Sequence, residues 1–400
     1  MAFIISLHLE KAMGSPVAFF VSGRELERQN RRERREKMIR EAIQKVIARQ
    51  NLDEAEMEEA MREITNGLAS PEQIASFVTA LRMKGETPIE IAAAAKVIRE
   101  KALKVDGGGE VVSLDREEIT VEKETILRTT TGGTGGTKVF NISTATALIA
   151  AGRGVKVAKS VRRSTPGFCG CADVLDALGF HLDMTPTQIE RCLREIGLCF
   201  IYDPLAGNGL SHLVPVRERI GIRTIFNLVD PLINPAQART QLLGVYEPEL
   251  TETMAAVLRN LGIKKALVFC GEDTLDEITL TGKTKVTFLQ EDHMKTYFIE
   301  PDDFGMRKAT LKDIEGGTRT RNAEIISAIL KGEQGPRRDI AVLNAAAVFT
   351  VAGRAQDLSE GLDLANESID SGAAFEKLEH LIRFGRGEQR FLRSHLELHL

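Results

Sequence analysis

The stretch TTTGGTGGTKVFNIST, residues 129–144, places four glycines among threonines and then changes to a mixed apolar and polar segment. Glycine loses more conformational freedom on folding than any other residue and offers no side chain for packing. A loop in which backbone N–H groups approach a phosphate closely would explain so many glycines. A flexible linker is the other explanation. The residues around the stretch decide between the two.

The composition is that of an ordinary globular chain. It has 400 residues, of which 43% are hydrophobic and 28% charged, with a formal net charge of −4. This length is enough for two domains, or for one large domain with a smaller one beside it. No apolar run reaches the length that spans a bilayer, so we expect no membrane partner. The apolar start is interrupted by His8, Glu10 and Lys11, and we interpret residues 1–30 as an irregular extension rather than a signal sequence.

The cysteines and the charge limit the class of protein further. The odd number of cysteines, without framework spacing, indicates a reducing compartment, and we expect a cytoplasmic location. The five are Cys169, Cys171, Cys192, Cys199 and Cys270. A lone Cys-x-Cys is weak evidence for a metal site, and small buried residues are the favoured interpretation. The negative net charge argues against a general nucleic-acid binder, although residues 24–40 are densely basic.

Helix-start signals mark the first third of the chain. Ser70 and Thr87 each precede a proline and, three residues later, a Gln or Glu, which is the capping-box pattern. A third copy begins at Thr185, before the amphipathic segment IERCLREIGL. These signals predict where helices begin and say nothing about function.

Beyond about residue 105, strand-like runs such as VKVAKS, KKALVFC and KVTFLQ alternate with small-residue helical segments. We therefore predict an α/β fold, with a large α/β domain whose central mixed sheet is flanked by helices, plus a small all-helical domain made of separated chain segments. The predicted parts are an extension (1–30), the helical domain (31–105), the first α/β part with the phosphate loop (106–180), a helical return (181–222), the second α/β part (223–385) and a tail (386–400). A ligand is expected in a cleft between the two domains.

Several motifs occur along the chain in the same order as in a known protein family. GGTGG…FNISTA, VAKSVRRS, GCADVLDALG, NLVDPLINP, GEDTLDEITLTG and GPRRDIAVLNAAA resemble the anthranilate phosphoribosyltransferase family over roughly residues 38–384. The resemblance implies transfer of ribose 5-phosphate from phosphoribosyl pyrophosphate to an aromatic amine in tryptophan biosynthesis. It also implies Mg²⁺, a small-molecule acceptor and a homodimer formed through the helical domain.

The resemblance assigns the donor side of this reaction. It implies that phosphoribosyl pyrophosphate is bound by Gly133, Thr134, Gly135, Gly136, Asn141, Ser143, Thr144 and Lys159. It implies that Mg²⁺ is held by Ser143, Asp276 and Glu277, and one or two carboxylates plus substrate phosphates are the ligands that Mg²⁺ usually takes. With these neighbours, the phosphate-loop explanation of the glycines is favoured over the linker.

The acceptor side departs from the family. The loop aspartate is replaced by Thr137 or, without a gap, by Gly135, and the family's Lys-His-Gly-Asn-Arg has become KSVRR at 159–163. Its His-His pair has become Ala206-Gly207. Arg217 matches the arginine that binds the carboxylate of anthranilate, with an ordinary surface arginine as the alternative, and Arg162 adds a bulky cation in the same pocket. We expect Arg162 and Arg217 to contact the acceptor, and we predict that anthranilate is not the best one.

Two other functions stay open at this point. Some relatives have lost the acceptor motif and look like non-catalytic nucleic-acid binders, a role that basic residues could serve through phosphate contacts. The retained carboxylates Asp276 and Glu277 argue against it. A nucleoside phosphorylase, whose fold carries a similar TGG loop, is the weaker alternative.

Overall fold

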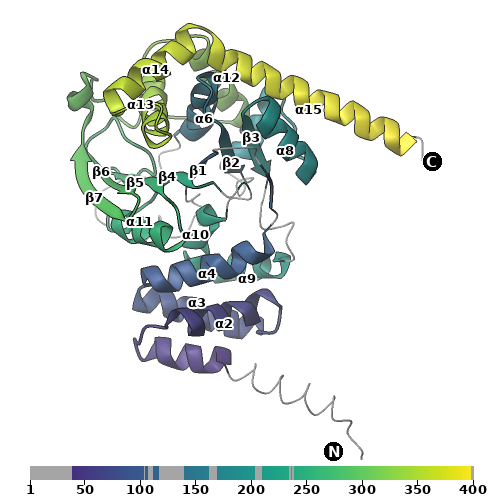
Figure 1. Cartoon of the computed structure of the whole chain (residues 1–400), viewed down its shortest axis with the longest axis vertical. Helices are drawn as coiled ribbons and strands as arrows, with labels where there is room; N and C mark the ends of the chain where they lie inside the picture. Colours follow the sequence, from purple (N-terminus) through teal and green to yellow (C-terminus); the bar gives the residue numbers. More distant parts are fainter. Residues whose placement is uncertain are drawn as a thin grey trace, which may run out of the picture.

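The computed structural model describes residues 38–102, 104–106, 111–116, 139–161, 169–202, 210–233, 236 and 238–397. Figure 1 shows a stack of helices below a twisted sheet with further helices above it, and the long helix α15 (Ala373–Glu397) leaving at the top. This is the α/β fold with a helical domain that the sequence predicts. Among the described helices, none is long and apolar enough to cross a membrane.

The lower stack begins with a helix over residues 38–47, followed by α2 (Glu54–Thr65), α3 (Pro71–Lys84) and α4 (Pro88–Lys101). The side chains of Ser70 and Thr87 accept hydrogen bonds from the N3 backbone of α3 and α4, as the capping-box pattern predicts. Helix α2 has the same device at Asp53. Local polar chemistry therefore fixes where these helices begin.

A later segment of the chain returns to this stack. Helices α9 (Val214–Ile220) and α10 (Ile225–Val229) pack against α3 and α4, so the helical domain is made of separated segments. The predicted return over 181–222 is nevertheless wrong for its first half. Helix α8 (Pro186–Glu195) packs beside β3 (Leu198–Tyr202), because both bury apolar side chains in the core of the sheet.

Seven strands in the described part of the chain form one mixed sheet, in the order β3-β2-β1-β4-β5-β6-β7. The first five are parallel, and β6 and β7 form an antiparallel hairpin at one edge. Their bounds, besides β3, are β1 (Val112–Arg116), β2 (Val157–Val161), β4 (Thr240–Gly244), β5 (Lys265–Gly271), β6 (Thr284–Gln290) and β7 (His293–Ile299).

Helices cover both faces of the sheet, so the central strands are apolar on both sides. Leu242 and Leu267 point into a core shared with α6 (Ile142–Gly152) and α13 (Pro336–Val351). Leu243 and Val268 point the other way, into a core shared with the helical domain and α11 (Leu250–Asn260). This second core joins the sheet to the helical domain. The remaining helices are α7 (Cys171–Leu178), α12 (Arg319–Leu330) and α14 (Leu358–Asp370).

Candidate active site

Parallel strands bring the candidate residues to one edge of the sheet. Strands β2, β1, β4 and β5 are neighbours in that order and run the same way, so their carboxyl ends lie together. In open α/β sheets, ligands bind outside the carboxyl ends of such strands. Lys159 lies on β2, and Asp276 follows β5 but reaches the end of β4, so two strand steps, about 10 Å at about 4.8 Å for each step, separate the two strands that carry this edge.

Lys159 is a buried cation on β2. Its side chain is 1% exposed, and in the described part of the chain no carboxylate pairs with its ammonium group. A buried charge is costly unless an opposite charge compensates it. A bound phosphate group at this edge would supply that charge.

Two buried hydroxyl groups at the start of α6 lie near the end of β2, on the same side of the site as Lys159. Ser143 and Thr144 are 3% and 0% exposed, and their Oγ atoms have no hydrogen-bond partner among the described residues. Because β2 follows α6 after a short connection and packs against it, the first turn of α6 lies level with the end of β2. The start of a helix favours an anion, and these hydroxyls offer donors beside it.

Asn141, the residue before α6, has a different role from its neighbours. Its Nδ2 donates to the carbonyl oxygen of Cys169 at 3.2 Å, and its Oδ1 accepts from Nδ2 of Asn322 at 2.9 Å. Asn322 in turn accepts from the backbone N–H of Gly317 at 2.7 Å. The side chain predicted to contact phosphate thus ties the start of α6 to α7 and α12.

The Asp276–Glu277 pair follows β5 in a tightly anchored turn. Asp273 accepts hydrogen bonds from the hydroxyls of Thr279 and Thr281 at 2.7 and 2.5 Å. On the other side, Asn344 of α13 accepts from the backbone N–H of Ile278 and donates to its carbonyl oxygen, both at 2.9 Å. These contacts hold the backbone on both sides of the acidic pair. Glu277 is 3% exposed.

Close approach to β4 fixes the position of Asp276. A Cβ atom on Gly244, the last residue of β4, would clash with the carbonyl oxygen of Asp276, so this position requires glycine. Burial, and then the carboxylate of Asp276, raise the pKa of Cys270 to about 12. The acidic pair therefore sits against the ends of β4 and β5.

These donors fit a magnesium ion shared with a substrate. In the described ranges, no group of three or more His, Cys, Asp or Glu side chains could hold a metal ion by itself. Magnesium needs only one or two carboxylates when phosphate oxygens and water supply the rest. Asp276 and Glu277 are the side chains that would hold it. Ser143 lies in the first turn of α6, beside β2 rather than β4, so its contact with the same ion stays a prediction.

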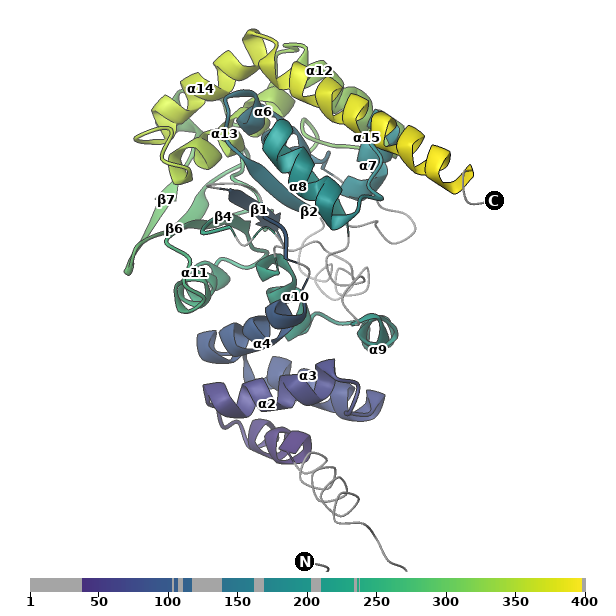
Figure 2. The ribbon, with the colours of Figure 1, turned by 45° about the vertical axis from the view of Figure 1, so that its right-hand side comes forward.

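Arg217 is already bound within the protein. Its Nη1 and Nη2 donate to Oδ1 and Oδ2 of Asp230 at 3.2 and 2.6 Å, and its guanidinium lies 5.7 Å from the ring centroid of Phe226. In Figure 2, α9, the helix that includes Arg217, lies beside the upper end of the helical stack, on the same side of the molecule as α7. The arginine is in the right part of the fold for an acceptor site, but it has a carboxylate partner.

Several predicted site residues lie outside the described residues: Gly133, Thr134, Gly135, Gly136 and Arg162, together with Thr137, Ala206 and Gly207. Their roles stay predictions.

Sequence reasoning missed Asp230, Asn322 and Asn344. The sequence signal for Asn344 is a polar residue inside the apolar run AVLNAAAV, because a buried amide needs partners. Asp230 gives the same signal, as a carboxylate inside the apolar run LVDPLI, whereas Asn322 lies in a polar segment without such a contrast.

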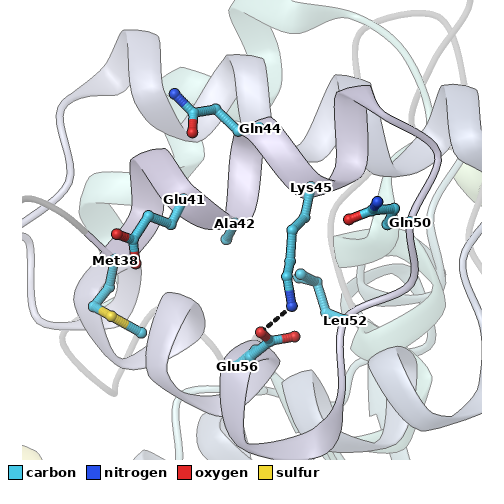
Figure 3. A pocket seen from close by; sticks show the side chains of 8 residues that line it. All are labelled: Met38, Glu41, Ala42, Gln44, Lys45, Gln50, Leu52 and Glu56. Carbon is cyan, nitrogen blue, oxygen red and sulfur yellow. Dashed lines mark hydrogen bonds and ion pairs between the residues drawn. The ribbon is translucent and has the colours of Figure 1, made fainter.

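A separate hollow of about 380 Å³ lies among the first helices of the helical domain (Figure 3), at the end of the molecule away from the sheet (Figure 1). Lys45 and Glu56 form an ion pair across it. It is lined by Met38, Glu41, Ala42, Gln44, Lys45, Gln50, Leu52 and Glu56. The hollow is therefore not part of the candidate site.

Comparison with known proteins agrees with this geometry. Residues 123–375 match the glycosyl transferase family, a/b domain, and residues 40–102 match the helical bundle domain of the same family. The anthranilate phosphoribosyltransferase of Citrifermentans bemidjiense is 48% identical over 345 residues, which cover 86% of this chain and 98% of that protein. That of Trichlorobacter lovleyi is 46% identical over 344 residues, 86% of this chain and 99% of that protein.

Solved structures give the same result. The crystal structure of anthranilate phosphoribosyltransferase from Thermus thermophilus is similar with a TM-score of 0.77 at 36% identity, covering 86% of this chain and 99% of that chain. The Saccharomyces cerevisiae enzyme in complex with PRPP and Mg has the same fold, with a TM-score of 0.75 at 24% identity, covering 87% and 98%.

The sheet, the helical bundle and both matches make the chain a member of the glycosyl transferase family. Within it, the chain belongs to the anthranilate phosphoribosyltransferase family. These relatives do not favour the alternative of a non-catalytic nucleic-acid binder.

Proposed function

We propose that this protein is a Mg²⁺-dependent phosphoribosyltransferase, which transfers ribose 5-phosphate from phosphoribosyl pyrophosphate to a small acceptor and releases pyrophosphate. The observation that carries the proposal is the buried Lys159 ammonium, which has no carboxylate partner among the described residues and lies at the edge where Asp276 and Glu277 emerge. An anionic donor substrate with a metal ion satisfies both charges.

Each group at the strand ends then has a task on the donor. Lys159 binds a phosphate group through a charge-assisted hydrogen bond, and the Ser143 and Thr144 hydroxyls donate to neighbouring phosphate oxygens. Asp276 and Glu277 hold Mg²⁺. When bound, the ion neutralises the charge that develops on the leaving pyrophosphate. Fixed donors at that position stabilise the transition state because they need no reorganisation as the charge appears.

The acceptor binds, in this proposal, where the helical domain meets the strand ends, near Arg217. A pocket that holds the amine in line with the anomeric carbon supplies much of the rate by positioning. The altered residues around 159–171 lead us to propose that anthranilate is not the best acceptor.

Calorimetric titration with phosphoribosyl pyrophosphate, with and without Mg²⁺, tests the donor site. We expect a dissociation constant on the order of micromolar with Mg²⁺. Replacing both Asp276 and Glu277 with Ala should abolish the effect of Mg²⁺, because no other carboxylate in the proposed site would hold the ion.

The matched control removes another adjacent acidic pair. Asp302 and Asp303 lie in the exposed turn η5 (Pro301–Phe304) after β7, two strands beyond β5, and their replacement by Ala should leave the titration unchanged. Equal loss in both double variants, or Mg²⁺-independent binding in the unaltered protein, would contradict the proposed donor site.

We further propose a homodimer formed through the helical domain, in the cytoplasm. Ile47, Met83 and Ile89 are 67%, 70% and 52% exposed there, and burying them supports association. Replacing Ile47 and Met83 with Glu should then convert a dimer into a monomer in sedimentation velocity. A monomeric unaltered protein would contradict the proposal.

A further inference from the structure

The acceptor side of the site contains an internal carboxylate. Asp230 binds the guanidinium of Arg217 through both oxygens, in the fork geometry that a substrate carboxylate would use. The two side chains are only 14% and 19% exposed, so water competes little for the pair.

The backbone that carries Asp230 is held firmly in place. Asp230 begins η4 (Asp230–Leu232), where the carbonyl oxygen of Pro231 accepts from Nε2 of Gln241 at 2.8 Å. The carbonyl oxygen of Leu232 accepts from Nε of Arg99 at 2.6 Å. Bonds to β4 and to α4 therefore fix this turn between the sheet and the helical domain. The carboxylate is part of the same chain and already in position, so a free carboxylate competes with it at a large disadvantage.

Binding a second carboxylate beside the first is also unfavourable. The other N–H groups of Arg217 could still donate, but two carboxylates would then share one positive charge and repel each other. The guanidinium of Arg223, six residues along the chain, lies 3.7 Å from the ring centroid of Tyr246, so its face is engaged by that ring. The Arg217–Asp230 pair as a whole is neutral.

We propose that Asp230 is a specificity-determining residue: it occupies the carboxylate-binding fork of Arg217 and directs the transferase toward uncharged aromatic amines, against aminobenzoates. This inference rests on the proposed function and names the chemical class of the acceptor.

The first test compares two acceptors of nearly the same shape, anthranilate and its neutral amide, anthranilamide, with saturating phosphoribosyl pyrophosphate and Mg²⁺. The unaltered protein should favour anthranilamide in kcat/KM by about tenfold or more. The variant Asp230→Asn should raise the ratio of kcat/KM for anthranilate to kcat/KM for anthranilamide by about tenfold, because the guanidinium of Arg217 can then bind the substrate carboxylate.

The matched control is Asp370→Asn. Asp370 pairs with Arg338 at 2.8 Å, far from the strand ends, so its loss should alter neither acceptor. If Asp230→Asn does not fold by circular dichroism, Asp230→Ser replaces it, and the preference of the unaltered protein is a test in any case. A preference for anthranilate in the unaltered protein, or an unchanged ratio in the variant, overturns the inference.

A binding measurement separates this inference from the proposed function. Anthranilate fluorescence reports its binding without turnover, and Asp230→Asn should bind it about tenfold more tightly than the unaltered protein. Calorimetry with phosphoribosyl pyrophosphate tests the donor site independently. Normal donor binding without a gain in anthranilate binding overturns the inference alone, whereas no donor binding contradicts the proposed function.

Discussion

Two cations of the candidate site differ in whether a carboxylate compensates their charge. Lys159 is 1% exposed and has no carboxylate partner among the described residues, whereas Arg217 is bound by both oxygens of Asp230. A folded protein tolerates a buried, uncompensated charge at a cost in stability. Such a cost is typical of a site that a ligand completes. A paired arginine needs no ligand.

The difference divides the site into a donor side and an acceptor side. The donor side, with Lys159, Ser143 and Thr144, has unsatisfied groups that an anion would complete. On the proposed acceptor side, Asp230 already compensates the charge of Arg217. We infer that the donor side retains the chemistry of the family while the acceptor side has changed.

The largest expected effect on stability and donor binding comes from a substitution that displaces the turn with Asp276 and Glu277. In Gly244→Ala the new methyl group meets the carbonyl oxygen of Asp276 and displaces the acidic turn. We expect the free energy of unfolding to fall by about 2–3 kcal/mol. Binding of phosphoribosyl pyrophosphate with Mg²⁺ should weaken by about 100-fold or more, measured by calorimetry.

A glycine outside the site provides the control for this substitution. Gly85 has φ of 90° and nothing near its Cβ position, so Gly85→Ala should cost about 1 kcal/mol from backbone strain alone. Donor binding should then stay normal. Normal donor binding in a folded Gly244→Ala protein would show that the turn is not part of the donor site.

The next effect separates binding from stability at Lys159. In Lys159→Met the proposed phosphate contact is lost, and affinity for phosphoribosyl pyrophosphate should fall by about 100-fold. The free energy of unfolding should stay level or rise by about 1 kcal/mol, because an uncompensated buried charge is removed. Chemical denaturation and calorimetry measure the two quantities.

Lys264 provides the control, since it is 57% exposed in its pair with Glu291 and lies at the opposite end of β5. Lys264→Met should change neither quantity. A marked loss of stability in Lys159→Met would mean that the ammonium has a structural role, and the contrast with Arg217 would fail.

The parts of this molecule that the sequence predicts correctly are those decided by neighbouring residues. The capping boxes at Ser70, Thr87 and Thr185 form as predicted, because each depends on residues three positions apart. Strand β3 is not among the predicted strands, because a short apolar run such as LCFIY fits a strand and a buried helix segment equally well. Without β3 the sequence offers no strand for α8 to pack against, so α8 is wrongly placed in the helical domain.

The residues of the candidate site also differ in whether the sequence could predict them. Lys159, Asp276 and Glu277 come from motifs that the chain shares with its family. The Asn322–Asn141 hydrogen bond joins residues 181 positions apart, and pairing across such a distance depends on the fold rather than on a local pattern. Asp230 lies within a motif that fits the family, so its contact with Arg217 became visible only in three dimensions.

The smallest expected effect, on stability alone, comes from Arg217→Met, which tests the second of the two cations. Arg217→Met removes the guanidinium that compensates the carboxylate of Asp230. We expect the free energy of unfolding to fall by about 1–2 kcal/mol, less than for a fully buried pair because both side chains keep some contact with water. Donor binding should be unchanged, the reverse of the result for Lys159→Met. Arg321→Met, in an exposed pair with Glu324, is the control and should alter stability by less than about 0.5 kcal/mol. If Arg217→Met were as stable as the unaltered protein, the pair would contribute no net stability, and a substrate carboxylate could displace Asp230 at little cost.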